Sequence, residues 1–172
     1  PERLRSLEAH RRGRLVSLVS SSSLIERLVP GADLLIGAVL TAGGRAPTLV
    51  VEALVRQMQP GSVVVDVAID QGGCFETSRP TTHQEPTYVV DGVVHYCVAN
   101  MPGGYARTST MALNNATMPF AVSLANKGAR QAMLEDPHLL KGLNVHQGKV
   151  TYKAVCDALG YEFHEPREAL AQ

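Results

Sequence analysis

The stretch Ser62-Val63-Val64-Val65-Asp66-Val67-Ala68-Ile69 decides the fold, because a short apolar run of this kind is typical of a strand buried in a parallel sheet. Asp70-Gln71-Gly72-Gly73 follows at once, a turn whose glycines tolerate positive φ angles. A second apolar run, Asp33 to Leu40, is likewise expected to be a strand covered on both faces. Between the two runs, Thr48 to Met58 has apolar residues at helical spacing. The order strand, helix, strand predicts a βαβ unit of a parallel sheet.

Further elements are expected upstream of this unit. Pro1-Glu2-Arg3-Leu4 is typical of a helix start, since proline is tolerated at the first helical position and acids suit the first turn. Arg14 to Val19 alternates like a strand. Ser23-Leu24-Ile25-Glu26 matches a capping box, which predicts a short helix that ends at Pro30-Gly31.

The downstream part changes from strands to helices. Asp91-Gly92 lies between two valine-rich stretches and predicts a hairpin that leads into a final strand, Val93 to Ala99. From Thr108 the pattern is helical. A long helix capped by Thr108 or Ser109 is expected to end at Gly128, and two short helices should follow, over 129–134 and 153–159.

Composition narrows the function classes. The 172 residues carry 16 Lys+Arg and 16 Asp+Glu, so a net charge of zero gives no reason to expect nucleic acid or an anionic membrane as partner. Hydrophobic residues make up 45% and charged residues 19%, which is typical of a globular protein. No apolar run reaches the roughly 18 residues of a membrane span.

The cysteines indicate a reducing compartment. Cys74, Cys97 and Cys156 lie far apart, with no CxxC pair and no suitably spaced histidine, so neither a zinc site nor a disulfide framework is expected. The chain is therefore predicted to be cytoplasmic, without a metal. It begins with Pro1 instead of methionine, which predicts processing or a longer protein.

Chemistry is expected where the parallel strands end, because open parallel sheets bind ligands beyond the carboxyl ends of their strands. Four segments at those ends are rich in small, polar or glycine residues: 20–23, 39–44, 69–73 and 98–104. Such residues let backbone amides approach a ligand closely, which favours a nucleotide-like cofactor. However, no Gly-x-Gly-x-x-Gly stretch, P-loop or nucleophile elbow is present.

Two polar residues at these ends are candidates for chemistry. Asp70 ends a buried strand beside an apolar wall, where a carboxylate can handle protons, or it caps the following turn. Asn100 can donate to and accept from a bound carboxamide or carbonyl, with Met101 flexing against a planar ring, or it forms the turn before Pro102-Gly103. Asp66 is expected to be paired with nearby donors, and His95 to be structural.

The whole pattern resembles the C-terminal half of bacterial L-alanine dehydrogenases. The likeness is carried by the block Val65 to Thr82, by Tyr96-Cys97-Val98-Ala99-Asn100-Met101-Pro102, and by Ala32 to Leu40. It continues through Thr108 to Pro119 and Lys141 to Asn144. The block Asp70-Gln71-Gly72-Gly73-Cys74-Phe75-Glu76 is the most specific part.

The resemblance implies a fold and a reaction. The fold would be α/β, a Rossmann-like doubly wound parallel sheet that lacks its first βαβ phosphate-loop unit, followed by helices of the substrate domain. Residues 1–107 would be the C-terminal part of the NAD-binding domain, and 108–172 the helical C-terminal part of the substrate domain. The family interconverts L-alanine with pyruvate and ammonia using NAD, usually as a homohexamer.

The resemblance also implies site residues. Asp70 matches the catalytic aspartate, and Asn100 and Met101 match residues at the substrate and the nicotinamide. The expected cofactor-binding residues are these three together with Arg3, Ser20, Val39, Leu40, Val67, Ala68, Ile69, Val98 and Ala99.

This chain departs from the family in two ways. The glycine-rich phosphate loop, the ribose-binding acid and the N-terminal half, with its substrate-binding Arg and Lys and its catalytic His, would precede Pro1. Gly103-Gly104-Tyr105-Ala106 differs from the usual proline-bearing loop. The chain is therefore expected to be inactive alone. The alternative is a nucleotide-binding module of a transhydrogenase-like subunit without dehydrogenase activity.

Overall fold

The computed structural model describes residues 2–11 and 15–171. The first part of the chain contains α1 (Glu2–Arg11), α2 (Ser22–Leu28), η1 (Val29–Gly31), β1 (Leu34–Gly37), α3 (Glu52–Val55), β2 (Val63–Asp66), η2 (Val67–Gln71), β3 (Thr87–Val90) and β4 (Val93–Tyr96). The second part contains η3 (Met101–Tyr105), α4 (Ala106–Lys127), α5 (Ala129–Glu135), α6 (Pro137–Leu140), β5 (Val145–His146), β6 (Lys149–Val150), α7 (Lys153–Leu159) and α8 (Pro166–Ala171).

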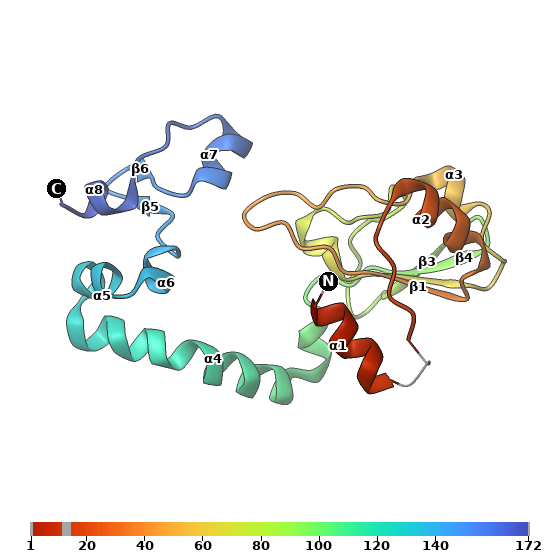
Figure 1. Ribbon diagram of the computed structural model, residues 1–172, viewed down its shortest axis with the longest axis horizontal. Coiled ribbons are helices and arrows are strands. Elements are labelled where there is room, and N and C mark those ends of the chain that lie inside the picture. Colours follow the sequence, from red (N-terminus) through yellow and green to blue (C-terminus); the bar gives the residue numbers. More distant parts are fainter. Residues whose placement is uncertain (1, 12–14, 172) are drawn as a thin grey trace.

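The sheet confirms the predicted α/β class. Its strand order is β1-β2-β4-β3, with β1, β2 and β4 parallel and β3 antiparallel to β4. Because the three parallel strands point the same way, their carboxyl ends lie along one edge of the sheet. The loops that follow these strands are therefore brought together as the sequence predicted (Figure 1).

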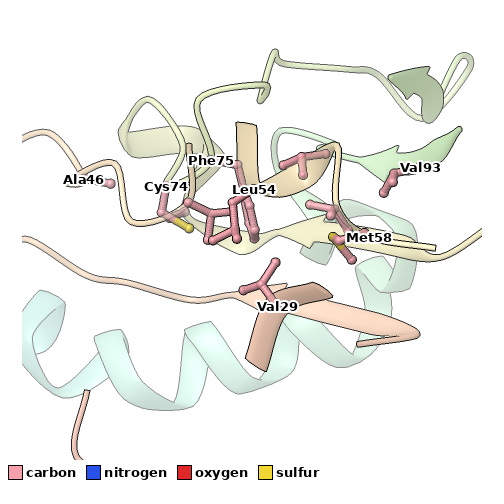
Figure 2. Packing of buried hydrophobic residues seen from close by; sticks show 11 residues of the cluster. Val29, Ala46, Leu54, Met58, Cys74, Phe75 and Val93 are labelled. Carbon is pink, nitrogen blue, oxygen red and sulfur yellow. The ribbon is translucent and has the colours of Figure 1, made fainter. Parts of the chain in front are cut away.

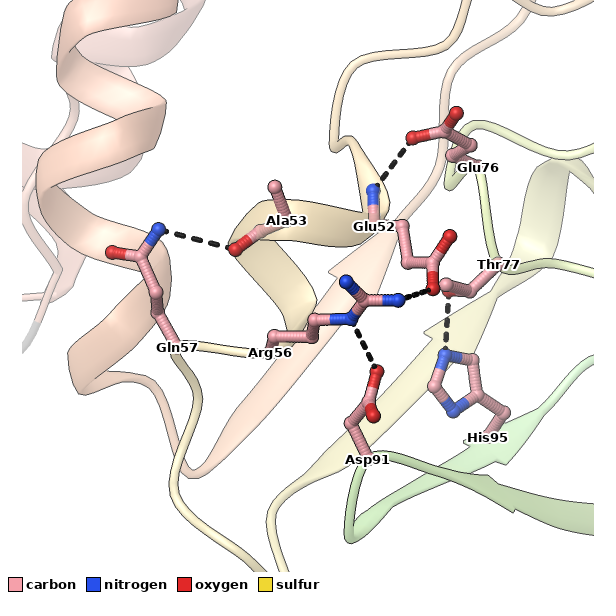
Figure 3. Close-up of polar contacts among 8 residues, drawn as sticks. All are labelled: Glu52, Ala53, Arg56, Gln57, Glu76, Thr77, Asp91 and His95. Atoms are coloured by element: carbon pink, nitrogen blue, oxygen red, sulfur yellow. Dashed lines mark hydrogen bonds and ion pairs between the residues drawn. The ribbon is translucent and has the colours of Figure 1, made fainter.

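The predicted hairpin is confirmed at Asp91-Gly92. Both residues have positive φ angles, 51° and 81°, as a two-residue hairpin turn requires. Arg56, just after α3, forms ion pairs with Asp91 and with Glu52 (Figure 3). The interactions raise the pKa of the Arg56 guanidinium above its ordinary value, the hydrogen bond to Asp91 contributing most. The hairpin tip is thereby tied to α3.

An aliphatic core lies between the sheet and the helices α2 and α3 (Figure 2). Val64 of β2 and Val93 of β4 are fully buried, and Leu54 and Met58 pack against them from α3 and the turn after it. Phe75 closes the cluster from the loop after η2. Burial of apolar surface at roughly 25 cal/mol per Å² makes this cluster the main stabilising element of the α/β part.

One predicted strand does not form, and another forms with one face exposed. Residues 15–20 form no regular structure, although Arg14 to Val19 alternates like a strand, and Val19 is 87% exposed. Arg14 itself lies outside the described residues. A strand needs a neighbour to satisfy its backbone, and none of the described strands lies beside this segment. Strand β1 forms within the predicted segment, but Leu34 and Ile36 are 55% and 57% exposed, so the strand is not covered on both faces.

Three helix starts also differ from the prediction. The N-cap of α2 is Ser21 instead of Ser23, since the Leu24 amide donates to Ser21 Oγ at 3.3 Å. Helix α3 begins only at Glu52, whose amide donates to Glu76 Oε2 at 2.7 Å, as Figure 3 shows. Helix α4 begins at Ala106, two residues before the predicted cap, and ends at Gly128 as predicted.

Helix α4 carries the chain away from the sheet towards the C-terminal elements (Figure 1). None of its described residues is buried, and Leu113 is 65% exposed. The C-terminal elements have a small core of their own, with Leu140, Leu143 and Leu170. No helix in the described part combines the length and apolar character that crossing a membrane requires.

Candidate active site at the carboxyl edge of the sheet

The loop after β2 is fixed from inside by Asp66. The carboxylate is fully buried, and its Oδ1 accepts from the Ala68 amide at 3.0 Å. Its Oδ2 accepts from the Cys74 amide at 2.9 Å and from Ser78 Oγ at 2.5 Å. Donors of this kind offset the cost of burying a charge. Asp66 therefore closes the loop 67–74 into a fixed turn, which agrees with the expectation that it is paired.

Gly73 is required for this turn. Its φ angle is +81°, and a Cβ there would lie 2.8 Å from Asp66 Oδ2 and 2.8 Å from Ser78 Cβ. Any side chain would therefore strain the backbone and displace the buried carboxylate. The glycine in Asp70-Gln71-Gly72-Gly73 thus has a local structural reason.

Cys74 is not available as a nucleophile in this turn. Burial raises the pKa of its thiol to about 12, and the neighbouring Asp66 charge adds to the effect. Only a thiolate is strongly nucleophilic, so a thiol held protonated is inert at neutral pH. All three cysteines are free and buried, as expected from their spacing.

Asp70 projects from this turn at the carboxyl edge. It is exposed, lies in η2 directly after β2, and lines a hollow of about 250 Å³. The wall opposite comes from the loop after β1. Five residues predicted from the sequence line this hollow together, along with Ala38 and Gln71: Val39, Leu40, Val67, Ala68 and Asp70.

Asn100 lies after β4, the last of the three parallel strands, and directly before η3. Its backbone is left-handed, with φ 58° and ψ 50°, and its carbonyl accepts from the Gly103 amide at 2.9 Å. His83 Nε2 lies 3.1 Å from the same carbonyl and can donate to it. Asn100 lines a second hollow, of about 580 Å³, with Pro102, Gly103 and the first two turns of α4. It is therefore both a turn residue and a wall of a cavity.

His95 is held inside the sheet, away from these hollows. It is fully buried, with Nδ1 3.0 Å from the Val93 carbonyl and Nε2 2.8 Å from Thr77 Oγ1, a contact that Figure 3 also shows. Its ring stacks on Tyr88 with centroids 5.0 Å apart. Burial lowers the pKa of His95 below its ordinary value. The neutral ring fits a structural position.

The other predicted residues whose side chains the structure describes do not line either hollow. Ile69 and Val98 are buried, Met101 begins η3, and Ala99 is exposed. Ser20 lies in the irregular segment before α2. Arg3 belongs to α1, but its side chain lies outside the described residues.

One residue that sequence reasoning did not single out does line the first hollow. Gln71 bonds through its side chain to the backbone of Thr41, thirty residues away in the chain. No local pattern reports such a contact, so the sequence carries no signal for it. Ser78 was missed for the same reason.

The described residues contain no group of three or more His, Cys, Asp or Glu side chains that could hold a metal ion. The polar groups at the edge are instead one carboxylate and two carboxamides, from Asp70, Gln71 and Asn100. Such a set can exchange a proton and orient a carbonyl or an amide.

Comparisons with known proteins agree with this fold. The chain belongs to the alanine dehydrogenase/PNT family: residues 1–153 match the model of its C-terminal domain. Alanine dehydrogenase from Halomonas elongata is 59% identical over 95% of this chain and 44% of its own length. The enzyme from Lysinibacillus sphaericus is 54% identical over the same shares.

A solved structure of an L-alanine dehydrogenase gives the same relation. An L-alanine dehydrogenase aligns over 92% of this chain and 44% of its own, with 53% identity and a TM-score of 0.79. A transhydrogenase from Sinorhizobium meliloti aligns over 52% of this chain, with 30% identity and a TM-score of 0.48. The chain thus spans less than half the length of the alanine dehydrogenases that it matches.

Proposed function

We propose that this chain is the C-terminal part of an NAD-dependent alanine dehydrogenase, which interconverts L-alanine with pyruvate and ammonia. One observation carries the proposal: Asp70 stands at the carboxyl edge on a turn fixed by buried Asp66, facing an apolar wall from the neighbouring strand's loop. The family membership and the named relatives support it. In this proposal residues 1–107 complete an NAD-binding domain and residues 108–172 belong to the substrate domain.

The residues at the edge suit part of a dinucleotide. The hollow beside Asp70 has small apolar walls from Val39, Leu40, Val67 and Ala68, which suit a planar ring. Its volume of about 250 Å³ is below the roughly 300–1,000 Å³ of most ligand pockets, so it can take only part of such a cofactor. Ile69 would support this wall from inside, and Arg3, Ser20, Val98 and Ala99 remain proposed contacts to the rest of NAD.

We assign a separate role in the reaction to each of the polar and apolar side chains at the edge. The hollow beside Asp70 would hold part of NAD, whose chemistry when bound would be that of a hydride acceptor. Asp70 would hold and release the proton exchanged at the substrate nitrogen or at the water that replaces it. Asn100 would orient a carbonyl or carboxamide with its two-sided amide, and Met101 would pack against a ring.

The assembly is part of the same proposal. We infer a cytoplasmic homohexamer, as the family resemblance implies. The three free, buried cysteines suit a reducing compartment. Large apolar side chains of α4 are exposed in this chain, and burial against further protein would remove them from water: Met111, Leu113, Met118, Phe120 and Val122.

A chimera tests the proposed reaction. In it, the part of Halomonas elongata alanine dehydrogenase that aligns with this chain is replaced by residues 1–172; identity of 59% favours correct packing. We expect alanine-dependent formation of NADH, with kcat/KM within about tenfold (roughly 1.4 kcal/mol) of the parent enzyme. A folded chimera that binds NADH but does not oxidise alanine would contradict the proposal and favour the transhydrogenase-like module.

A further inference from the structure

The side chain of Gln71 joins two loops that follow neighbouring strands. The Thr41 amide donates to Gln71 Oε1 at 3.0 Å, and Gln71 Nε2 donates to the Thr41 carbonyl at 2.7 Å. The Ala46 amide also donates to the backbone carbonyl of Gln71, at 2.9 Å. The loop after β1 is thus bonded at three points to the residue that follows Asp70.

The same loop is held on its other side by a close packing contact. Gly43 has a φ angle of +70°, and a Cβ there would lie only 2.3 Å from Tyr152 Cε1. The tip of the loop therefore lies against the segment that leads into α7, a proximity that Figure 1 also shows. Between Gln71 and Tyr152 the loop has little freedom to move away from either.

This bridge spans the hollow that contains Asp70. Ala38, Val39 and Leu40 of the first loop form one wall, and Val67, Ala68 and Asp70 form the other. Gln71 lines the hollow as well and connects the two walls. The spacing between the walls therefore depends on its two side-chain hydrogen bonds.

Only an amide of this length can make both bonds. A glutamine offers one acceptor and one donor side by side, which matches the amide and carbonyl of one backbone residue. A glutamate can accept from the Thr41 amide, but its second oxygen would face the Thr41 carbonyl without a proton to donate. A methionine has the length and neither bond.

We propose that Gln71 is a positioning residue, which sets the width of the cofactor-side hollow and holds Asp70 at its edge. The inference rests on the proposed function, because it assigns a role within the same site. Gln71 would act on the site through its hydrogen bonds to the backbone of Thr41 and not through contact with the substrate.

The test compares Gln71→Met and Gln71→Glu in the chimera with a matched control, Gln57→Met. Gln57 is exposed, and its side chain donates to the Ala53 carbonyl of α3 (Figure 3). We expect both Gln71 variants to lose about tenfold or more in kcat/KM. Gln71→Met loses both hydrogen bonds, whereas Gln71→Glu loses one and places an oxygen opposite the Thr41 carbonyl. The loss should appear both as a higher KM for NAD and as a lower kcat, with the melting temperature almost unchanged. Gln57→Met should behave like the parent chimera.

Glutamate is the decisive variant, since it keeps polarity and length. If Gln71→Glu and Gln71→Met both retain kcat/KM within about twofold, or if their losses follow the melting temperature alone, the inference is wrong.

A second readout does not depend on turnover. Hydrogen exchange of the backbone in residues 38–46 should become faster in Gln71→Met and stay unchanged in Gln57→Met. An inactive chimera would contradict the proposed function, whereas unchanged exchange in Gln71→Met would contradict the bridge.

Discussion

At the scale of single residues, Asp66 and Asp70 show how one short segment places two carboxylates in opposite environments. Asp66 ends β2, is fully buried, and takes donors from the backbone and from Ser78. Asp70, four residues later, is exposed in η2. The buried carboxylate fixes the turn, and the exposed one is the group that we propose for the chemistry.

Asn100 combines a backbone role with a proposed substrate role, and the two can be separated. Asn100→Gly removes the carboxamide but suits the left-handed φ of 58°, whereas Asn100→Ala removes the carboxamide and adds strain of about 1–2 kcal/mol. In the chimera we expect both variants to lose about ten- to hundredfold in kcat/KM, in the alanine and pyruvate directions alike. Only Asn100→Ala should also lower the melting temperature clearly.

Steady-state kinetics and melting curves on the same preparations check this. If Asn100→Gly keeps its catalytic efficiency, Asn100 is a turn residue and the substrate role is wrong.

Sequence reasoning reached Asp70 and Asn100 because two apolar runs stop there, although the strands themselves end earlier, β2 at Asp66 and β4 at Tyr96. It missed Gln71 and Ser78, because each bonds to a residue distant in the chain, at separations of 30 and 12 positions. Their roles follow from which loops the sheet brings together, and local composition does not report this.

At the scale of elements, His95 gives β4 a pH-dependent stability. Burial lowers the pKa of His95, whereas an unfolded histidine titrates near about 6.5. As the pH falls below about 6.5, His95 binds a proton more readily in the unfolded state than in the folded state. The free energy of unfolding therefore decreases. Above about pH 6.5 His95 is neutral in both the folded and the unfolded state, so it no longer makes the free energy of unfolding depend on pH.

We expect the free energy of unfolding to fall as the pH is lowered below about 6.5, by at most about 1.4 kcal/mol per pH unit from this group. Denaturant titrations of wild type, His95→Gln and the exposed-histidine control His83→Gln measure the slope. The slope should flatten only in His95→Gln; equal slopes in all three would refute the assignment.

The elements that were predicted correctly are those determined by local sequence. The hairpin has Asp91-Gly92, which suits positive φ angles. Strand β2 forms at a dense run of valine, but it ends at Asp66, and the expected strand residues 67–69 belong to η2. The element predictions that failed depended on surroundings. Residues 15–20 have the alternation of a strand without a neighbouring strand, and α3 starts where Glu76, remote in sequence, caps it.

At the scale of the whole molecule, the carboxyl edge of the sheet is the proposed cofactor site, but this sequence has no glycine-rich phosphate loop to go with it. The sequence has no Gly-x-Gly-x-x-Gly stretch, and affinity for a diphosphate comes largely from such a loop with the amides of a helix N-terminus. We therefore expect the isolated chain to bind NAD weakly or not at all. Titration calorimetry checks this, with the chimera as the positive control and circular dichroism to establish folding. Micromolar binding by the folded chain alone would contradict the expectation.

The exposed length of α4 belongs to this scale too. Its helical pattern and its end at Gly128 were predicted from the sequence, but its lack of buried residues was not. Local patterning determines that a helix forms, whereas its burial depends on what else packs against it.

The turnover of Asp70→Asn in the chimera tests the central claim most directly, since that claim makes Asp70 the proton-handling group of an alanine dehydrogenase. Asparagine keeps the size of the side chain and removes its charge and proton capacity. We predict that kcat falls by about 100- to 10,000-fold while the dissociation constant for NADH changes little. Asp33→Asn, an exposed carboxylate at the amino end of β1, should leave both quantities unchanged. An Asp70→Asn chimera that turns over alanine within a few-fold of its parent would contradict the account.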